Sequence, residues 1–297
     1  MYSAIDRKEI SIAVLLDMSA AFDTVDHDLL IRKLEHLGIV GDALEWLKLY
    51  LSNRFHSTYV AGIRSEPLAL TIGVPQGSVL GPLLFTIYIR DLGEIIQQTG
   101  MRYSIYADDV QLLVHVKPTQ EEVLNGIRKS EGCLKTIESW TSENYLQLNA
   151  SKTEFIAFGS KEQLAKVQFE DLVINGNTVI IKSMVRNLGV ILDSTLKFGS
   201  HIDKICRSAY ANLRTLHRLR NSLNNSQFAL FAHALILSRI DTFPAVLYGV
   251  EKIQLKRLQR IIKATFRASY RLKRAEAVSE KMRRRGSELH VTVANNI

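Results

Sequence analysis

Several kinds of protein are excluded by what the sequence lacks. Only two cysteines, Cys133 and Cys206, occur in 297 residues, with no Cys-x-x-Cys pair and no Cys/His cluster. A disulfide framework and a structural zinc site are therefore not indicated, and an intracellular, reducing compartment is expected. No apolar run approaches the roughly 20 residues of a membrane span, and Met1 to Glu9 is too polar for a signal peptide. We expect a soluble protein with no membrane partner.

Familiar catalytic motifs are also missing. The chain has no Gly-x-x-x-x-Gly-Lys loop for a bound nucleotide and no Gly-x-Ser-x-Gly nucleophile elbow. Its histidines are scattered singly, which is more typical of core or surface residues than of catalytic ones. Any catalytic site must therefore rest on other side chains.

Charge is distributed unevenly along the chain. Residues 201–297 carry 19 Lys/Arg against 6 Asp/Glu, whereas residues 1–200 carry 19 against 24, so the formal charges are +13 and −5. An acidic body followed by a basic region favours a polyanionic partner held by the basic part. The alternative is a set of solvated helix faces. With 46% hydrophobic and 23% charged residues, the chain can bury a core in one large domain or two ordinary ones.

Hydrophobic periodicity predicts an α+β fold. Expected helices begin near Asp26 or Asp28, at Asp42, after Ser78 and at the Thr119-x-x-Glu122 capping motif, and further helices lie near 200–222, 226–239 and 251–273. Expected strands are Ile10 to Leu16, Phe55 to Val60, Leu68 to Ile72, Met101 to Tyr106, Val110 to Val116, Thr153 to Phe158, a hairpin within Leu172 to Ile181, and Leu188 to Leu192. A domain boundary is expected near residues 199 and 200, because the predicted strands there give way to predicted helices and the sequence becomes basic.

Two adjacent carboxylates mark the most informative stretch, Tyr106-Ala107-Asp108-Asp109. The flanking apolar runs read as strands, so Asp108 and Asp109 belong at a hairpin tip. Taken alone, this pair is most simply a hairpin loop, since Asp is a favoured turn residue. Asp17 changes that balance because it ends the apolar run Ile10 to Leu16. Carboxylates from neighbouring strands can hold divalent cations for phosphoryl chemistry.

A glycine-rich loop, Gly73-Val74-Pro75-Gln76-Gly77-Ser78, precedes an apolar segment, Val79 to Ile89, that reads as a helix. Such a loop allows the backbone to approach a ligand closely, and a helix amino terminus favours negative charge. An ordinary strand-to-helix turn is the alternative. Gln76 favours a ligand role, because its amide can both donate to and accept from a nucleotide.

Three segments in order resemble the palm motifs of reverse transcriptases from non-LTR (LINE-type) retrotransposons. They are Leu15 to His27, Gly73 to Pro82, and Tyr106 to Asp109. Leu146 to Thr153 and Leu188 to Asp193 resemble the family's next palm motif and its primer grip. The resemblance covers about Ile10 to Lys273. It implies a reverse-transcriptase-like palm, a small mostly antiparallel sheet with flanking helices, in residues 1–199, followed by a helical basic thumb in 200–274.

The resemblance also implies roles for individual residues. Asp17, Asp108 and Asp109 would hold two Mg²⁺ ions, with Mn²⁺ as a substitute, and Lys152 would donate a proton to the departing pyrophosphate. Phe22 would exclude a ribose 2′-hydroxyl. The other residues expected to contact the nucleotide are Ser19, Ala20, Gln76 and Gly77. The expected substrates are an RNA template, a DNA primer and deoxynucleoside triphosphates.

The expected nucleic-acid contacts of the thumb lie on its last helix. Several of its cations recur at three- or four-residue spacing, and those expected to bind are Lys256, Arg257, Arg260, Lys263 and Arg267. Residues 275–297 form an unassigned basic tail, and the fingers that precede the palm in the family are largely missing. RNA-directed DNA polymerisation is the leading function. The alternatives are a catalytically impaired nucleic-acid-binding remnant and a metal-dependent nuclease or other phosphotransferase, against which Phe22 and the Gln76 loop argue.

Overall fold

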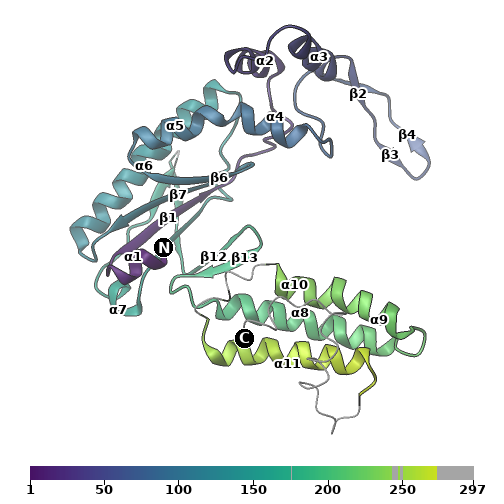
Figure 1. The fold of residues 1–297 in the computed structure, drawn as a ribbon. Coiled ribbons are helices and arrows are strands. Elements are labelled where there is room, and N and C mark those ends of the chain that lie inside the picture. Colours follow the sequence, from purple (N-terminus) through teal and green to yellow (C-terminus); the bar gives the residue numbers. More distant parts are fainter. Residues whose placement is uncertain (175, 243–246, 248–249, 273–297) are drawn as a thin grey trace. The chain divides into compact units, whose positions relative to one another are not determined.

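The computed structural model describes residues 1–174, 176–242, 247 and 250–272. The predicted tail 275–297 and the hairpin centre Asn175 lie outside these residues. The chain forms two compact units, Met1–Val185 and Arg186–Ile297, whose described parts are shown in Figure 1. The expected boundary between palm and thumb, near residues 199 and 200, stays a prediction. Among the described residues, no helix has the length and apolarity to cross a membrane.

A five-stranded sheet forms the centre of the first unit. Its order is β11-β8-β1-β7-β6, and only the β11–β8 pair is parallel. The strands are β1 (Ile10–Leu16), β6 (Arg102–Tyr106), β7 (Asp109–Val116), β8 (Glu154–Phe158) and β11 (Ile181–Lys182). Strand β1 is central and almost wholly buried, which explains its nearly continuous apolar sequence. The predicted α+β class and its mostly antiparallel sheet are confirmed.

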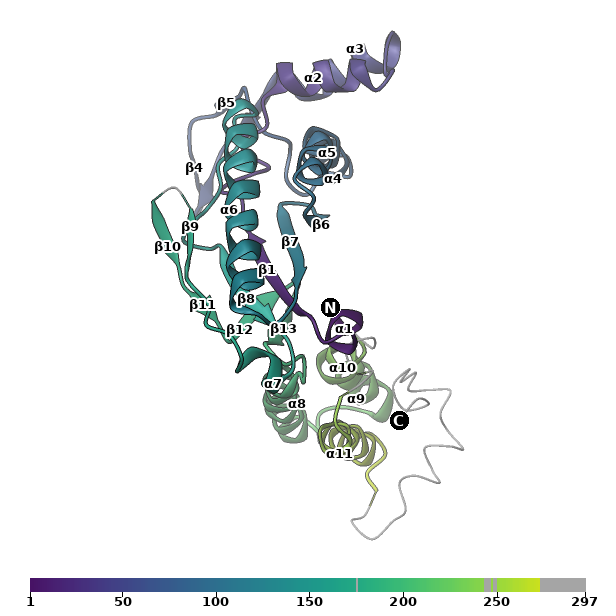
Figure 2. The same cartoon turned by 90° about the vertical axis from the view of Figure 1, so that its left-hand side faces the viewer.

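Helices cover the sheet and build the core of the first unit. The long helix α6 runs along one face beside β7 and β1 (Figure 2). Its amino terminus is capped by Thr119, and Asp26 rather than Asp28 caps α2 by accepting from the Leu29 amide at 2.8 Å. The helices are α1 (Tyr2–Asp6), α2 (His27–His36), α3 (Asp42–Leu51), α4 (Gly81–Tyr88), α5 (Arg90–Gln98), α6 (Gln120–Glu143) and α7 (Lys161–Leu164).

A narrow β-arm, residues 54–70, extends from the rest of the first unit (Figure 1). Strand β2 (Arg54–His56) pairs with β5 (Leu68–Leu70), and β3 (Tyr59–Val60) pairs with β4 (Ile63–Arg64). The prediction of one strand from Phe55 to Val60 was therefore wrong. Thr58 and Ser65 interrupt it, because the Ser65 hydroxyl accepts from the Thr58 amide at 2.9 Å and the Ser65 amide donates to the Thr58 carbonyl at 2.9 Å.

The structure has two further hairpins, of which the sequence predicted one. Strands β9 (Leu172–Ile174) and β10 (Asn177–Val179) pair as expected. The predicted strand from Leu188 was wrong at its start, because β12 (Met184–Asn187) and β13 (Val190–Asp193) are joined by Leu188 and Gly189. These two residues have positive φ values of 45° and 87°, as the tight turn of a hairpin requires.

Helices dominate the second unit. They are α8 (Gly199–Arg218), α9 (Asn225–Ala232), the π-helical turn η1 (His233–Leu237), α10 (Ser238–Asp241) and α11 (Lys252–Ser269). The buried side chain of Arg220 joins three of their ends. It donates to the carbonyls of Leu223, Ala268 and Ser269 and to the Asn225 side chain, and its guanidinium lies 4.8 Å from the Phe228 ring centroid.

Candidate functional site

Sheet register brings the candidate carboxylates together at one end of β1 and β7. Leu16 pairs with Val110, so Asp17 follows β1 at the same level at which Asp109 begins β7. Tyr106 pairs with Asp109, which leaves Ala107 and Asp108 as a two-residue turn with Ala107 at φ 52°. The hairpin predicted for this motif is confirmed, and the three aspartates share one edge of the sheet.

The charges of the three aspartates act on one another. The pKa of Asp109 is raised above its usual value, first because burial penalises the charged form and then through the negative charges of Asp108 and Asp17. All three side chains are half-buried. A bound cation would offset the repulsion between Asp109 and the two other carboxylates.

Lys152 supplies positive charge to this cluster. Its ammonium lies 3.1 Å from Asp17 Oδ2. That oxygen is shielded from solvent and accepts no hydrogen bond of ordinary geometry, so the contact is an ion pair and not a directed hydrogen bond. The loop carrying Lys152 is fixed against the strand end, since the Asn149 amide donates to the Asp17 carbonyl at 2.9 Å and the Ser19 amide donates to the Gln147 carbonyl at 2.9 Å.

The cluster fits a divalent cation in its chemistry. Carboxylate oxygens are the ligands that Mg²⁺ prefers, Oδ2 of Asp17 is a buried acceptor without a donor, and the three charges repel one another. In the described part of the chain, no group of three or more His, Cys, Asp or Glu side chains is arranged around a common metal position. Asp17 instead faces Lys152. The residues that would hold metal are Asp17, Asp108 and Asp109.

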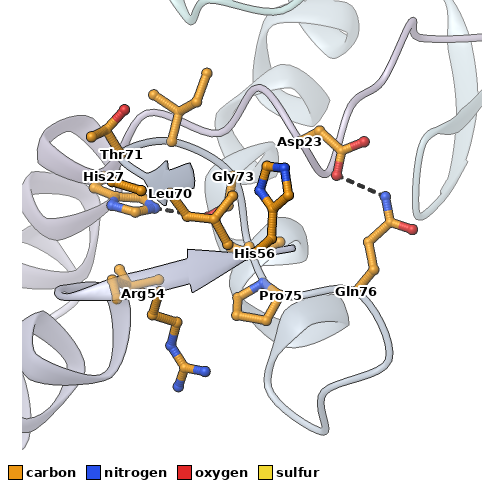
Figure 3. Close-up of a pocket in the computed structure, with 13 residues that line it drawn as sticks. Asp23, His27, Arg54, His56, Leu70, Thr71, Gly73, Pro75 and Gln76 are labelled. Carbon is orange, nitrogen blue, oxygen red and sulfur yellow. Dashed lines mark hydrogen bonds between the residues drawn. The ribbon is translucent and has the colours of Figure 1, made fainter. Parts of the chain in front are cut away.

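The Gly73–Ser78 loop is bound to the segment that follows Asp17. The Val74 amide donates to the Phe22 carbonyl at 2.8 Å, and Gln76 Nε2 donates to Asp23 Oδ1 at 2.7 Å (Figure 3). Gly73 has a φ of 84°, and a Cβ there would lie 2.8 Å from the Asp23 carbonyl oxygen. Only glycine allows this approach. Asp23 is thus tied to the loop through Gln76.

Phe22 lies beneath this loop. Its ring stacks on Phe85 of α4, with centroids 4.4 Å apart, and it is half-buried against the core. The ring therefore has a packing role, and its remaining exposed part is the portion that could meet a substrate. Ala20, at φ 48°, is exposed and accepts from the Asp23 amide in the same turn. Gly77, at φ 79°, has open space around it.

The five cations predicted on α11 are not equivalent. Lys256, Arg260 and Lys263 are exposed, whereas Arg257 and Arg267 are half-buried. Arg257 forms an ion pair with Asp203 of α8 and also donates to Gln254 Oε1 at 2.7 Å. Part of its charge is therefore neutralised within the protein, and it is less available to an external phosphate.

Helix α8 adds basic residues that sequence reasoning missed. Two adjoining hollows of 630 and 780 Å³ lie between α8 and α11 and share His217 and Arg260. On α8 the polar lining residues follow one another at helical spacing: Arg207, Tyr210, Arg214 and His217. That spacing was visible in the sequence and would have indicated the same face. From α11, the cations Arg257, Arg260, Lys263 and Arg267 line the hollows, while Lys256 lies outside them.

Comparisons with known proteins show the family of the chain. Residues 3–192 match the family described as "Reverse transcriptase (RNA-dependent DNA polymerase)". The chain is 30% identical over 260 residues to the probable RNA-directed DNA polymerase from transposon BS of Drosophila melanogaster, covering 84% of this chain and 27% of that protein. It is 29% identical over 229 residues to the RNA-directed DNA polymerase from mobile element jockey of Drosophila funebris, covering 74% and 24%.

Among solved structures, the telomerases of Candida albicans and Candida tropicalis in complex with a fragment of telomeric RNA are similar to the chain. Their TM-scores are 0.45 and 0.43, at 14% and 12% identity, with 91% of this chain covered in each and 47% and 45% of theirs. The chain spans about a quarter of the length of the curated transposon relatives. The match over residues 3–192 nonetheless includes Asp17, Gln76, Asp108 and Asp109, so the chain belongs to the reverse transcriptase family, in its non-LTR retrotransposon branch.

Proposed function

We propose that the chain extends a DNA primer on an RNA template by transferring deoxynucleotides to the primer 3′-hydroxyl. The observation that carries this is the meeting of Asp17, Asp108 and Asp109 at one sheet edge, with Lys152 beside them. Two Mg²⁺ ions, or Mn²⁺, held by these carboxylates would lower the pKa of the attacking hydroxyl and neutralise the leaving oxygens.

The protein's own side chains would position the substrates. Gln76, oriented by Asp23, would contact the incoming nucleotide or the template. Ser19, Ala20 and Gly77 would contact the nucleotide through their backbone. The exposed part of Phe22 would occupy the space of a ribose 2′-hydroxyl. The ammonium of Lys152 would give a proton to the departing pyrophosphate, which explains why a lysine stands at the carboxylate cluster.

Primer extension by the whole chain on a homopolymer RNA template with Mg²⁺ tests this function. Asp17→Asn and Asp108→Asn each remove one ligand charge at nearly constant volume, so we expect the rate to fall by about 10³-fold or more. Asp6→Asn, at an exposed carboxylate of α1, is the matched control and should extend normally. Unchanged extension by Asp17→Asn or Asp108→Asn would rule out the assigned site.

A second candidate, binding of nucleic acid without useful catalysis, is favoured by a separate observation. The basic hollows between α8 and α11 are built entirely within the second unit and do not depend on the carboxylates. We propose that Lys256, Arg257, Arg260, Lys263 and Arg267 of α11 contact phosphates. Arg260 and Lys263, which are exposed and line the hollows, contribute most, and Lys256, outside the hollows, contributes less. Two buried free thiols, Cys133 and Cys206, support an intracellular location for such a protein.

Salt dependence of binding tests the interface separately from catalysis. Binding through phosphates releases counterions, and removing one cation that binds a phosphate should lower the log–log slope by about 0.7 to 0.9. Arg260→Gln with Lys263→Gln should therefore flatten the slope for an RNA–DNA hybrid by about 1.5 units. Lys252→Gln with Lys256→Gln removes the same charge from α11 outside the hollows and should change the slope less. Equal effects of the two pairs would show that only net charge matters.

A further inference from the structure

A single carboxylate organises the loop that joins β13 to α8. Asp193 Oδ1 accepts from the Thr195 amide at 3.1 Å, from the Thr195 hydroxyl at 2.7 Å and from the Lys197 amide at 3.1 Å. Asp193 Oδ2 accepts from the Phe198 amide at 2.6 Å, and the Asp193 carbonyl accepts from the Leu196 amide at 2.9 Å. Hydrogen bonds to an ionised carboxylate are stronger than those between neutral groups. The last residue of β13 therefore holds residues 194–198 in one conformation.

That conformation is unusual for the residues that adopt it. Leu196 and Phe198 have φ values of 52° and 56°, in the left-handed region that residues other than glycine rarely occupy. Both side chains are buried, so packing and the hydrogen bonds of Asp193 together keep the backbone there. Such conformations persist only where the surroundings determine them, and they concentrate at functional positions. The loop is therefore built as a fixed joint between β13 and α8.

This joint connects the β12–β13 hairpin to both helices that line the basic hollows. Phe198 directly precedes α8, and the hairpin adjoins this helix (Figure 1). On α8, Nδ1 of the buried His201 accepts from the Ile191 amide of β13 at 3.3 Å, which requires that this nitrogen carry no proton. Lys197 forms an ion pair of 2.8 Å with Glu251, the residue before α11. The orientation of the hairpin on the helices is thus set by contacts around the Asp193 loop.

We propose that Asp193 is a positioning residue that fixes the β12–β13 hairpin on the basic helices, so that both contact one nucleic-acid duplex together. The contact with the duplex rests on the proposed function, because the hollows carry the cations proposed to bind phosphates and the hairpin includes the segment expected to grip the primer. A hairpin that is already oriented needs no ordering when the duplex binds, so its fixation raises affinity. Asp193 acts through the loop, since its carboxylate is used on the backbone there.

Distances between spin labels test the joint in the whole chain without nucleic acid. The labels are attached to Leu188→Cys, in the exposed hairpin turn, and Arg218→Cys, at the exposed end of α8, and double electron–electron resonance measures their separation. The native thiols Cys133 and Cys206 are buried, and a chain without introduced cysteines measures any labelling of them. We expect a narrow distance distribution in the parent and a broad one in Asp193→Ala. Asp193→Asn should lie between them, because its amide oxygen can still accept the hydrogen bonds made to Oδ1.

Binding of an RNA–DNA hybrid by the unlabelled whole chain tests the consequence of the joint. Removal of a negative charge by itself strengthens binding to a polyanion, whereas release of the hairpin should weaken it. We expect the Kd measured by fluorescence anisotropy to rise about tenfold in Asp193→Ala and about threefold in Asp193→Asn. Glu251→Gln is the matched control, because it removes one negative charge and an exposed ion pair at the same joint. Its Kd should stay constant or fall.

The outcomes separate a positioning role from a merely structural one. A narrow distance distribution in folded Asp193→Ala would overturn the proposal, and so would a broad distribution with unchanged hybrid affinity or an equal rise in Kd for Glu251→Gln. If Asp193→Ala does not fold, Asp193→Asn decides, and unaltered distances and affinity in that variant would overturn the proposal. A parent chain that binds no hybrid refutes the proposed function, while the spin-label distances still decide whether Asp193 fixes the hairpin.

Discussion

Lys152 Nζ and Asp17 Oδ2 lie 3.1 Å apart, so a lysine occupies the position beside a carboxylate that a cation would also seek. The Lys152 side chain is largely exposed, at 64%, while that of Asp17 is 27% exposed. An exposed pair is screened by solvent and is worth little to stability. Its importance is local, because Lys152 and a metal ion held by Asp17 would compete for the same oxygen.

Lys152→Met should have two opposite effects on catalysis. Without the ammonium, the Mg²⁺ concentration that gives half-maximal rate should fall severalfold, because the competitor is gone. The maximal rate should fall by about 10²-fold, because the proton donor is removed. A Mg²⁺ titration of primer extension measures both quantities, with Lys117→Met, an exposed lysine after β7, as the control. An unchanged maximal rate would remove Lys152 from the catalytic residues.

Phe22→Ala should change substrate choice and stability together. Removing the ring opens one hydroxyl-sized volume, so incorporation of ribonucleotides relative to deoxyribonucleotides should rise. Loss of the Phe85 stack should also cost about 2 kcal/mol, less than for a fully buried phenylalanine. Phe22→Tyr keeps the ring and is the matched control. If the incorporation ratio stays constant in folded Phe22→Ala, the residue serves packing alone.

Arg220→Met should destabilise the second unit. The buried guanidinium donates to three carbonyls and one side-chain oxygen, and each of these acceptors would lose that donor. We expect a loss of about 3 kcal/mol in the free energy of unfolding. Chemical denaturation followed by circular dichroism measures it. Arg218→Met changes an exposed arginine of α8 and should have little effect; similar losses in both variants would contradict the role assigned to Arg220.

Acid should destabilise the first unit through His115. Burial, and then the charge of Arg102, lower its pKa below the ordinary value of 6.5, while Arg7 and the amino terminus add to this and Glu9 opposes it. The unfolded chain therefore takes up the proton first, so this contribution is complete above about pH 6.5 and is lost as the pH falls below that value.

Urea unfolding at about pH 5 and pH 7.5 measures that contribution. The neutral ring is held by the buried Ser11 hydroxyl, 2.8 Å from Nδ1, so His115→Gln should reduce the difference in stability between the two pH values. For one group, the change in the free energy of unfolding between the two pH values should stay below about 1.4 kcal/mol for each unit by which folding lowers its pKa. An identical pH difference in the variant would exclude His115 as its source. His201, whose pKa is also lowered by burial, contributes in the same direction in the second unit.

Sequence reasoning located the carboxylates because their signals are local. An apolar run ending at Asp17 and two strands around Asp108 and Asp109 specify strand ends, and strand ends in one sheet share an edge. The interactions of Lys152 with Asp17 and of Gln76 with Asp23 could not be predicted. They depend on how loops that are distant in sequence pack against the segment after β1. Hydrophobic periodicity carries no information about such packing.

The residues of α8 that line the basic hollows were missed for a different reason. The basic pattern of α11 was read alone, whereas a hollow is a property of two helices packed together. The ion pair of Arg257 with Asp203 follows from the same packing and reduces the charge that the sequence suggested. The strand predicted from Phe55 to Val60 splits after His56 because of hydrogen bonds between Thr58 and Ser65, residues whose side chains compete with regular strand pairing.

The sheet order has a consequence for how the protein is made. Strand β1 leaves the ribosome before its two neighbours, β7 and β8, which are synthesised only after the β-arm and most of the helices of the first unit. Until then both edges of an apolar strand are open, which is the condition under which nascent chains aggregate or require chaperones. Asp17 can meet Asp109 only after β7 has been synthesised, and Lys152 later still, so a nascent chain has no complete carboxylate cluster until more than half of the first unit exists.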